Sequence, residues 1–291
     1  MKKLVVLLLC VSVSASMLAG CSSSQETSVA SEAAASDTET SEASGEEEAA
    51  EVSEETAEAA ETETSGDTVY TIACDQAFAP FSIQAEDGSY YGIDVELLDA
   101  IAEIEGFSYE LQPMDFSGII PALVSGTIDG AIAGMNITEE RKESVDFSDG
   151  YYESPSSLVV RLDDESITSF EDLEGKVAAC KEGTTGQIWC EDNADVYGFT
   201  VTTYPDSVSM MMAVSNEQAD FLIEDYPVIT YQIAIGEQDN LRVAIDAIEE
   251  APQNGFAVKK GENAELLAMF NDGLAKIREN GTYDKIISQY E

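Results

Sequence analysis

The 291-residue sequence carries 58 Asp and Glu residues against 13 Lys and Arg, a formal net charge of −45, and it contains no histidine. So large an acidic surplus repels phosphate, and we expect no nucleic-acid partner. The lack of imidazole excludes a Ser-His-Asp or Cys-His nucleophile and a mixed Cys/His zinc site, and we expect neither a metal site nor a cofactor.

The N-terminus has the pattern of an export signal. Met1 to Lys3 supply positive charge, Leu4 to Val13 an apolar core, and Leu18 to Cys21 (Leu-Ala-Gly-Cys) a small-residue cleavage site. The apolar run is too short to span a bilayer stably. The pattern resembles a bacterial lipobox, which implies a signal peptide over residues 1–20 and a diacylglycerol group on the Cys21 thiol. The plainer alternative is an ordinary signal peptide with a chance cysteine.

Residues 21–66 are expected to be an acylated cysteine followed by an acidic, disordered tether. From Ser22 to Gly66 the sequence is mainly Ser, Thr, Ala and Glu, without Lys, Arg, aromatic residues or proline. Such a segment buries too little apolar surface to offset the entropy of ordering. A flexible chain of about 45 residues reaches roughly 35 to 40 Å. A long tether favours a lipid-anchored position on the extracellular face of a bacterial, Gram-positive cell membrane.

Strand and helix patterns alternate from Asp67 to Glu291. This region is long enough to form two lobes. Before the turn-rich residues 149–155, the periodicity predicts strands at Val69–Cys74, Phe107–Leu111 and Asp129–Met135, and helices at Asp94–Glu105, Gly118–Val124 and from Thr138. After that turn it predicts strands at Ser157–Arg161, Lys176–Lys181, Phe199–Tyr204, Ala219–Glu224 and Leu241–Ala247, with helices at Gly186–Asn193, Asp206–Asn216 and Tyr226–Ile235. The chain closes with a strand at Gly255–Lys259 and helices at Ala264–Glu279 and Tyr283–Gln289. Because helix follows strand, we expect parallel sheets wrapped by helices.

A series of short motifs runs in order through this region. They are Asp75-x-x-Phe78-x-Pro80-Phe81, Gly92-x-Asp94-Val95, Asp115-Phe116-x-x-Ile119-Ile120-Pro121, Gly134-x-Asn136-x-Thr138-x-x-Arg141, Val145-Asp146-Phe147-Ser148, Gly183-Thr184, Asp225 and Asn280-Gly281-Thr282-Tyr283. In this order the motifs resemble the extracellular solute-binding proteins of polar amino acid ABC importers (family 3), and most of all the glutamine-binding proteins.

The resemblance implies an α/β, two-lobed periplasmic-binding-protein-like fold, in which each lobe is a sheet wrapped by helices and two hinge strands join the lobes. It places the first lobe at residues 67–154 and 252–291 and the second at residues 155–251, with the ligand in the cleft between them. Chain order alone would suggest two contiguous halves.

The resemblance and elementary chemistry together predict how this cleft holds an α-amino acid. Arg141 suits the carboxylate, because its planar guanidinium can hold two oxygens at once and the first turn of its predicted helix favours an anion. Asp225, at the end of a predicted strand, suits the ammonium, together with the carbonyl of Gly134 and the side chain of Asn136. The plainer alternatives are that Arg141 pairs with Glu residues of its own helix and that Asp225 only caps the next helix.

The other predicted ligand-binding residues contact the stem, the carboxylate and the side chain. By the resemblance, Phe78 and Phe116 clamp the aliphatic stem, although on pattern alone each fits a core position equally well. Thr185 is the expected second-lobe donor to the carboxylate. Asp75 and Lys181 are left to face the ligand's side chain.

The pair Asp75 and Lys181 favours a neutral side chain, since a charged one would meet a like charge in a closed cleft. An amide can donate to the carboxylate and accept from the ammonium. We therefore expect glutamine first, with glutamate and asparagine binding more weakly. The chain departs from the glutamine-binding pattern at Asn136, where a hydroxyl residue is usual, at Glu224, where a histidine can occur, and at Cys180.

Three cysteines fall in the globular part, namely Cys74, Cys180 and Cys190. An odd set allows at most one intramolecular bridge. Because Cys180 closes a predicted strand and Cys190 lies in the next helix, a bridge between them fits an exported protein, with Cys74 left reduced.

Two functions from different classes follow. The first is a monomeric, non-catalytic receptor that captures an extracellular amino acid and hands it to an ABC transporter permease. The second is an exported enzyme on the same fold, such as a cyclohexadienyl dehydratase, with Glu224, Asp75 or Lys181 as its acid-base group. The tether and the complete amino-acid motif favour the receptor.

If Cys21 is the acylated residue, Cys21→Ala should prevent processing and acylation at this site, because the thiol that receives the lipid is gone. Mass spectrometry of the N-terminal peptide from the membrane fraction measures this directly. Wild-type protein found in the medium without lipid, beginning at Ser22 or later, would contradict the anchor.

Overall fold

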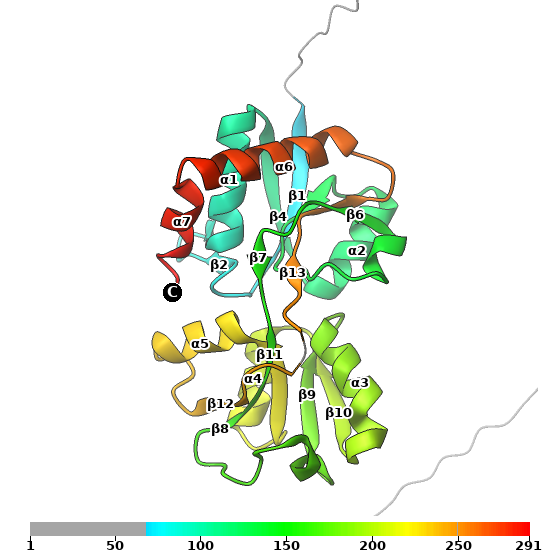
Figure 1. Ribbon diagram of the computed structural model, residues 1–291, viewed down its shortest axis with the longest axis vertical. Coiled ribbons are helices and arrows are strands. Elements are labelled where there is room, and N and C mark those ends of the chain that lie inside the picture. The colour runs from blue at the N-terminus through cyan, green and yellow to red at the C-terminus, as the bar shows by residue number, and fades with distance from the viewer. Residues whose placement is uncertain (1–67, 249) are drawn as a thin grey trace, which may run out of the picture. The chain divides into compact units, whose positions relative to one another are not determined.

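Two lobes make up the part of the chain that the computed structural model describes, residues 68–248 and 250–291 (Figure 1). Each lobe is built on a five-stranded sheet, and two short strands run between the lobes. The predicted signal peptide, Cys21 and the acidic tether lie outside the described residues. Within the described part of the chain, no helix is long and apolar enough to cross a membrane.

The first lobe combines the beginning and the end of the described chain. Its sheet has the order β4-β1-β5-β14-β6, with bounds Ser108–Met114, Val69–Asp75, Gly130–Ala131, Ala257–Lys259 and Val145–Phe147. Its helices are α1 (Ile93–Glu105), α2 (Phe116–Ser125), α6 (Ala264–Glu279) and α7 (Thr282–Ile287), and a small pair of strands is formed by β2 (Ile83–Gln84) and β3 (Tyr90–Tyr91). The C-terminal helices α6 and α7 pack against α1, so the last residues of the chain complete the core of the first lobe.

The second lobe is continuous in sequence. Its sheet has the order β10-β9-β11-β8-β12, with bounds Thr200–Tyr204, Val177–Lys181, Phe221–Asp225, Ser156–Arg161 and Leu241–Ile245. Its helices are α3 (Thr185–Tyr197), α4 (Ser207–Ser215) and α5 (Tyr226–Ala234), with a short 3-10 turn, η2, at Phe170–Leu173. The α4 contacts with β8, β9, β10 and β11 bury its apolar residues, including Met210 and Val214, against the sheet.

The two connections between the lobes pair with each other. β7 (Tyr152–Glu153) leads into the second lobe and β13 (Gln253–Asn254) leads back, and the two strands are antiparallel with Tyr152 opposite Asn254 (Figure 1). This arrangement confirms the predicted two-lobed α/β fold with two hinge strands. The lobe boundaries at residues 154/155 and 251/252 stay a prediction.

The expectation of parallel sheets is correct only in part, because each sheet also contains antiparallel pairs. β1 is parallel to β4 and β5, and β9 is parallel to β10 and β11. β14, however, is antiparallel to β5 and β6, and β8 is antiparallel to β11 and β12. The antiparallel strands β8 and β14 are those that enter directly from the hinge, so their direction is set by the crossing and not by a preceding helix.

The helix predicted from Thr138 is also absent. Only a 3-10 turn, η1, forms at Arg141–Glu143, closed in part by the backbone N–H of Arg141 donating to the Thr138 hydroxyl at 3.2 Å. Strand β6 begins at Val145, which leaves no length for a helix. The expected anion-binding helix terminus at Arg141 therefore does not exist.

The turn at Gly134 fixes the first-lobe wall of the cleft. Gly134 has φ +56°, and a Cβ there would lie 2.4 Å from a ring carbon of Phe78, so only glycine fits. Its N–H donates to Asp94 Oδ2 at 2.8 Å, and the Tyr151 hydroxyl donates to Asp94 Oδ1 at 2.7 Å. Burial raises the pKa of Asp94 to about 7, against the opposing effect of these hydrogen bonds. The buried carboxyl group holds this turn in place.

The expected Cys180–Cys190 disulfide is not formed, since Cys74, Cys180 and Cys190 are all free and buried. Cys180 and Cys190 pack in the same apolar core of the second lobe. The neighbouring Cys180 thiol and then burial raise the pKa of Cys190, and burial raises that of Cys74 to about 12. Because the thiolate is the reactive form, the Cys74 and Cys190 thiols resist oxidation in the folded protein.

Thiol counting on the denatured protein should accordingly find three free thiols in the described part of the chain. A chromogenic thiol reagent in strong denaturant, compared with a sample reduced beforehand, gives the number. Only one free thiol before reduction would show that the bridge forms.

Candidate ligand-binding site

A cavity lies between the two lobes and has an empty volume of about 390 Å³, including the part open to solvent. Strands β9 and β11 end at it, and helices α2 and α3 begin at it. This is where open α/β sheets place ligands. The lining residues are Phe78, Phe116, Gly134, Asn136, Arg141, Ser156, Lys181, Thr184, Thr185, Gly186, Ile223, Glu224 and Asp225. The structure thus brings together the predicted ligand-binding residues, with the exception of Asp75.

Arg141 is buried in this cavity, with 7% of its surface exposed. Its guanidinium donates to the carbonyl of Asn136 at 2.8 Å and to the carbonyl of Gly183 at 3.0 Å. No carboxylate of the described residues forms an ion pair with it, which removes the alternative that Arg141 pairs with a glutamate of its own segment. Burial lowers its pKa to about 10, although Asp225 and Glu140 oppose this. The guanidinium stays charged at neutral pH and can accept an anionic partner.

Asp225 lines the same cavity and lies at the end of β11. Its Oδ2 accepts a hydrogen bond from the Ser154 hydroxyl in the hinge at 2.6 Å. Its side chain makes no cap hydrogen bond to helix α5, so it does not act as the simple helix cap considered above. Burial and the neighbouring Glu224 raise the pKa of Asp225 to about 7. A cation placed beside it would stabilise the charged form.

Asn136 and Thr185 contact each other across the lobes. The Thr185 hydroxyl donates to Asn136 Oδ1 at 2.8 Å, and Asn136 Nδ2 donates to Asn254 Oδ1 of the hinge at 2.8 Å. Thr185 opens helix α3, whose N-cap Thr184 accepts from the Gln187 N–H. The start of this 13-residue helix, together with Arg141, gives the cavity a region of positive potential.

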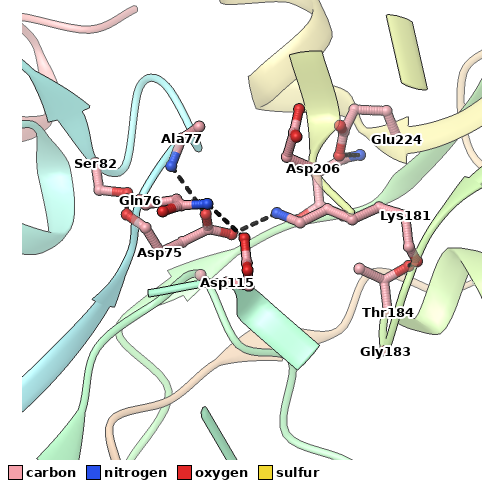
Figure 2. Close-up of polar contacts among 12 residues, drawn as sticks. Asp75, Gln76, Ala77, Ser82, Asp115, Lys181, Gly183, Thr184, Asp206 and Glu224 are labelled. Carbon is pink, nitrogen blue, oxygen red and sulfur yellow. Dashed lines mark hydrogen bonds and ion pairs between the residues drawn. The ribbon is translucent and has the colours of Figure 1, made fainter. Parts of the chain in front are cut away.

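Asp75 and Lys181 form an ion pair across the cleft (Figure 2). Both side chains are buried, 1% and 3% exposed, and Asp75 also accepts from the Ala77 N–H at 3.0 Å. Figure 2 shows Lys181 extending from β9 of the second lobe toward Asp75 at the end of β1. Lys181 lines the cavity and Asp75 does not. The two residues therefore satisfy each other before any ligand side chain is considered.

The predicted aromatic walls both line the cavity and are both in contact with cations. Lys181 Nζ lies 4.4 Å from the centre of the Phe78 ring and 5.2 Å from that of Phe116, and the Arg141 guanidinium carbon lies 5.4 Å from the latter. Phe78 also stacks on Phe81, with ring centres 5.3 Å apart. The rings thus position the cationic side chains as well as bounding the cavity.

Five lining residues were not among those predicted to bind the ligand, namely Ser156, Thr184, Gly186, Ile223 and Glu224. Glu224 and Ile223 precede Asp225 on β11, and Ser156 is opposite Asp225 in the antiparallel β8–β11 pair. The end of β11 was the signal that could have identified Glu224. Ser156 depends on a strand register that the sequence does not contain.

Comparisons with known proteins identify the family of this chain and support its fold. Residues 70–291 match the model of bacterial extracellular solute-binding proteins, family 3. A probable histidine-binding protein of Neisseria gonorrhoeae is 30% identical over 224 residues, which cover 76% of this chain and 82% of the relative. Among solved structures, an ancestral arginine-binding protein bound to glutamine is 36% identical, with a TM-score of 0.71, over 76% of this chain and 97% of that chain. Substrate-binding domain 2 of GlnP from Lactococcus lactis, in an open conformation, is 42% identical with a TM-score of 0.54, over 76% of this chain and 94% of that chain. The chain therefore belongs to family 3 of the bacterial extracellular solute-binding proteins.

Proposed function

We propose that this protein is the extracellular receptor of an ABC importer, which binds a polar amino acid between its lobes and delivers it to the permease. The observation that supports this most is Arg141, which is buried in the cavity and bonded only to two carbonyls among the described residues. Breaking a buried charge pair costs several kcal/mol, so a buried cation that has no ion-paired carboxylate favours the binding of an anion. An α-carboxylate fits the planar guanidinium.

In this proposal, each charged end of the amino acid has its own partners in the cavity. The α-carboxylate would lie between Arg141 and the start of α3, where it can accept from the Thr185 hydroxyl. The α-ammonium would donate to Asp225 and to the carbonyl of Gly134, which both line the cavity. Each group of the ligand would then have a partner of opposite charge or polarity, as a closed cleft requires.

For the side chain we propose a neutral amide, with glutamine preferred to glutamate and asparagine. Lys181 lines the cavity with its charge neutralised by Asp75, so it can donate to an amide carbonyl without attracting an anion strongly. Phe78 and Phe116 bound the space for the aliphatic stem. The ancestral relative has glutamine bound, while the Neisseria relative is named for histidine, so the family resemblance by itself does not select the amide.

We further propose that the receptor is a monomer held at the membrane by lipid on Cys21, with no catalytic activity of its own. The acid-base groups that a dehydratase would need are occupied in part, because Asp75 and Lys181 pair with each other. Incubation with prephenate or arogenate should therefore give no product, and product formation would favour the enzyme instead.

Glutamine should stabilise the protein against thermal unfolding, because a ligand that binds only the folded state adds its binding free energy. At about 100 times the dissociation constant the gain is roughly 2.7 kcal/mol, or very roughly 5 to 10 °C for a domain of this size. Melting curves against twenty amino acids measure this and rank the ligands. The receptor proposal fails if no amino acid raises the melting temperature, and the glutamine assignment fails if arginine, histidine or cystine binds more tightly.

Arg141→Ala should reduce glutamine affinity by roughly 30-fold to several thousand-fold, since truncating one partner of a buried charge pair costs about 2 to 5 kcal/mol. Arg141→Lys should restore little, because an ammonium cannot hold both oxygens in one plane. Titration calorimetry gives both affinities. Lys142→Ala is the matched control, since it removes a positive charge from the next residue, which does not line this cavity. Affinity within threefold of the wild type in either Arg141 variant would place the carboxylate elsewhere.

A further inference from the structure

A buried carboxylate oxygen without a partner lines the cavity beside the groups assigned above. Glu224 is 6% exposed, and its Oε2 atom has no hydrogen-bond partner among the described residues. The other oxygen, Oε1, accepts from the backbone N–H of Asp225 at 2.9 Å. A buried carboxylate oxygen that has lost its hydration requires a donor. The Ser207 hydroxyl, which is also buried without a partner in hydrogen-bond geometry, acts on this carboxyl group, and a ligand in the cavity is the other source of a donor.

Glu224 lies toward the side-chain end of the cavity, away from Arg141. The charges that act on its carboxyl group are those of Lys181 and Asp75, whereas Arg141 acts on the neighbouring Asp225. Figure 2 shows Glu224 and Lys181 together on the second-lobe side, with Asp75 across from them. Arg141 thus acts on Asp225 and not on Glu224, and the space beside Glu224 adjoins the proposed α-ammonium position at Asp225.

The charge at this end of the cavity is negative when the Glu224 carboxyl group is ionised. Lys181 and Asp75 neutralise each other in their ion pair, so Glu224 leaves this group of three residues with one negative charge in excess. Burial raises the pKa of Glu224, although Lys181 and the nearby Ser207 hydroxyl oppose this. Two things can therefore stabilise the Glu224 carboxyl group in this environment: a bound proton, or a hydrogen bond donated by the ligand.

We propose that Glu224 is a specificity-determining residue, which accepts a hydrogen bond from the end of the ligand's side chain and excludes a side chain that ends in a carboxylate. The inference rests on the proposed amino-acid-binding function. An amide or a cationic group can donate to Oε2. A carboxylate would meet a like charge in a cleft of low dielectric constant, and such a repulsive element discriminates between ligands of similar shape.

The test is the ratio of glutamine affinity to glutamate affinity, measured by titration calorimetry at pH 7 on the chain from Ser22 onward. Glu224→Gln keeps the size of the side chain and removes the charge, so this ratio should fall at least tenfold. Glu182→Gln is the matched control, because it removes the same charge from an exposed residue next to Lys181 and should leave the ratio unchanged. A ratio within threefold of the wild type in Glu224→Gln overturns the proposal.

A second measurement uses the wild-type protein and so does not depend on the variant folding. If glutamate enters beside Glu224, one of the two carboxylates must take up a proton, whereas glutamine needs none there. Calorimetry at pH 6 in two buffers of different ionisation enthalpy gives the protons exchanged with each ligand. Glutamate should take up close to one proton more than glutamine, and the subtraction cancels the shared contribution of Asp225. Equal proton exchange with measurable binding of both ligands overturns the proposal.

These outcomes separate the two levels of inference. If no amino acid binds the wild type, the receptor function itself fails. If glutamine binds and the ratio does not respond to Glu224→Gln, the receptor function stands and the role of Glu224 is wrong.

Discussion

The burial of one guanidinium governs the arrangement of the whole cleft. Arg141 donates to a carbonyl of the first lobe, that of Asn136, and to a carbonyl of the second, that of Gly183. Two carbonyls satisfy only part of a group with five N–H donors, and no carboxylate of the described residues is ion-paired with it, although the charges of Asp225 and Glu140 act on it. The cavity that holds this cation is also lined by the first turn of α3, by Asp225, which is bonded to the hinge, and by Lys181, which pairs with Asp75.

The contacts that join the lobes are made by the same side chains that would bind a ligand. Arg141 bonds the Gly183 carbonyl, Thr185 bonds Asn136, and Lys181 pairs with Asp75. A ligand therefore exchanges contacts between protein groups for contacts of its own, and only the difference between the two sets contributes to affinity. Affinity in this cleft depends on how well the ligand replaces these contacts, and the buried area alone does not determine it.

Local patterns predicted the elements of this fold well, because the periodicity of apolar residues in strands and helices can be read directly from the sequence. β1, α1 and α6 lie where the apolar spacing predicted them, and Arg141 and Asp225, which were predicted from separate motifs, line one cavity. The antiparallel strands β8 and β14 follow from the crossing at the hinge, which periodicity does not encode. The mutual pairing of Asp75 and Lys181 depends on how closely the lobes approach, which no local pattern contains.

The division of the first lobe between the two ends of the chain has a consequence for biosynthesis. The strands of the second lobe lie between Ser156 and Ile245, so this lobe is fully synthesised while part of the first is still missing. β14 lies between β5 and β6, and α6 covers α1, so the first lobe lacks an internal strand and a core helix until the last residues emerge. A ribosome that stops before Gln253 would release a complete second lobe attached to an open sheet, whose unpaired strand edges invite aggregation. Strand β14 and helix α6 are therefore the elements that must be added after the second lobe before the first-lobe wall of the binding cleft can form.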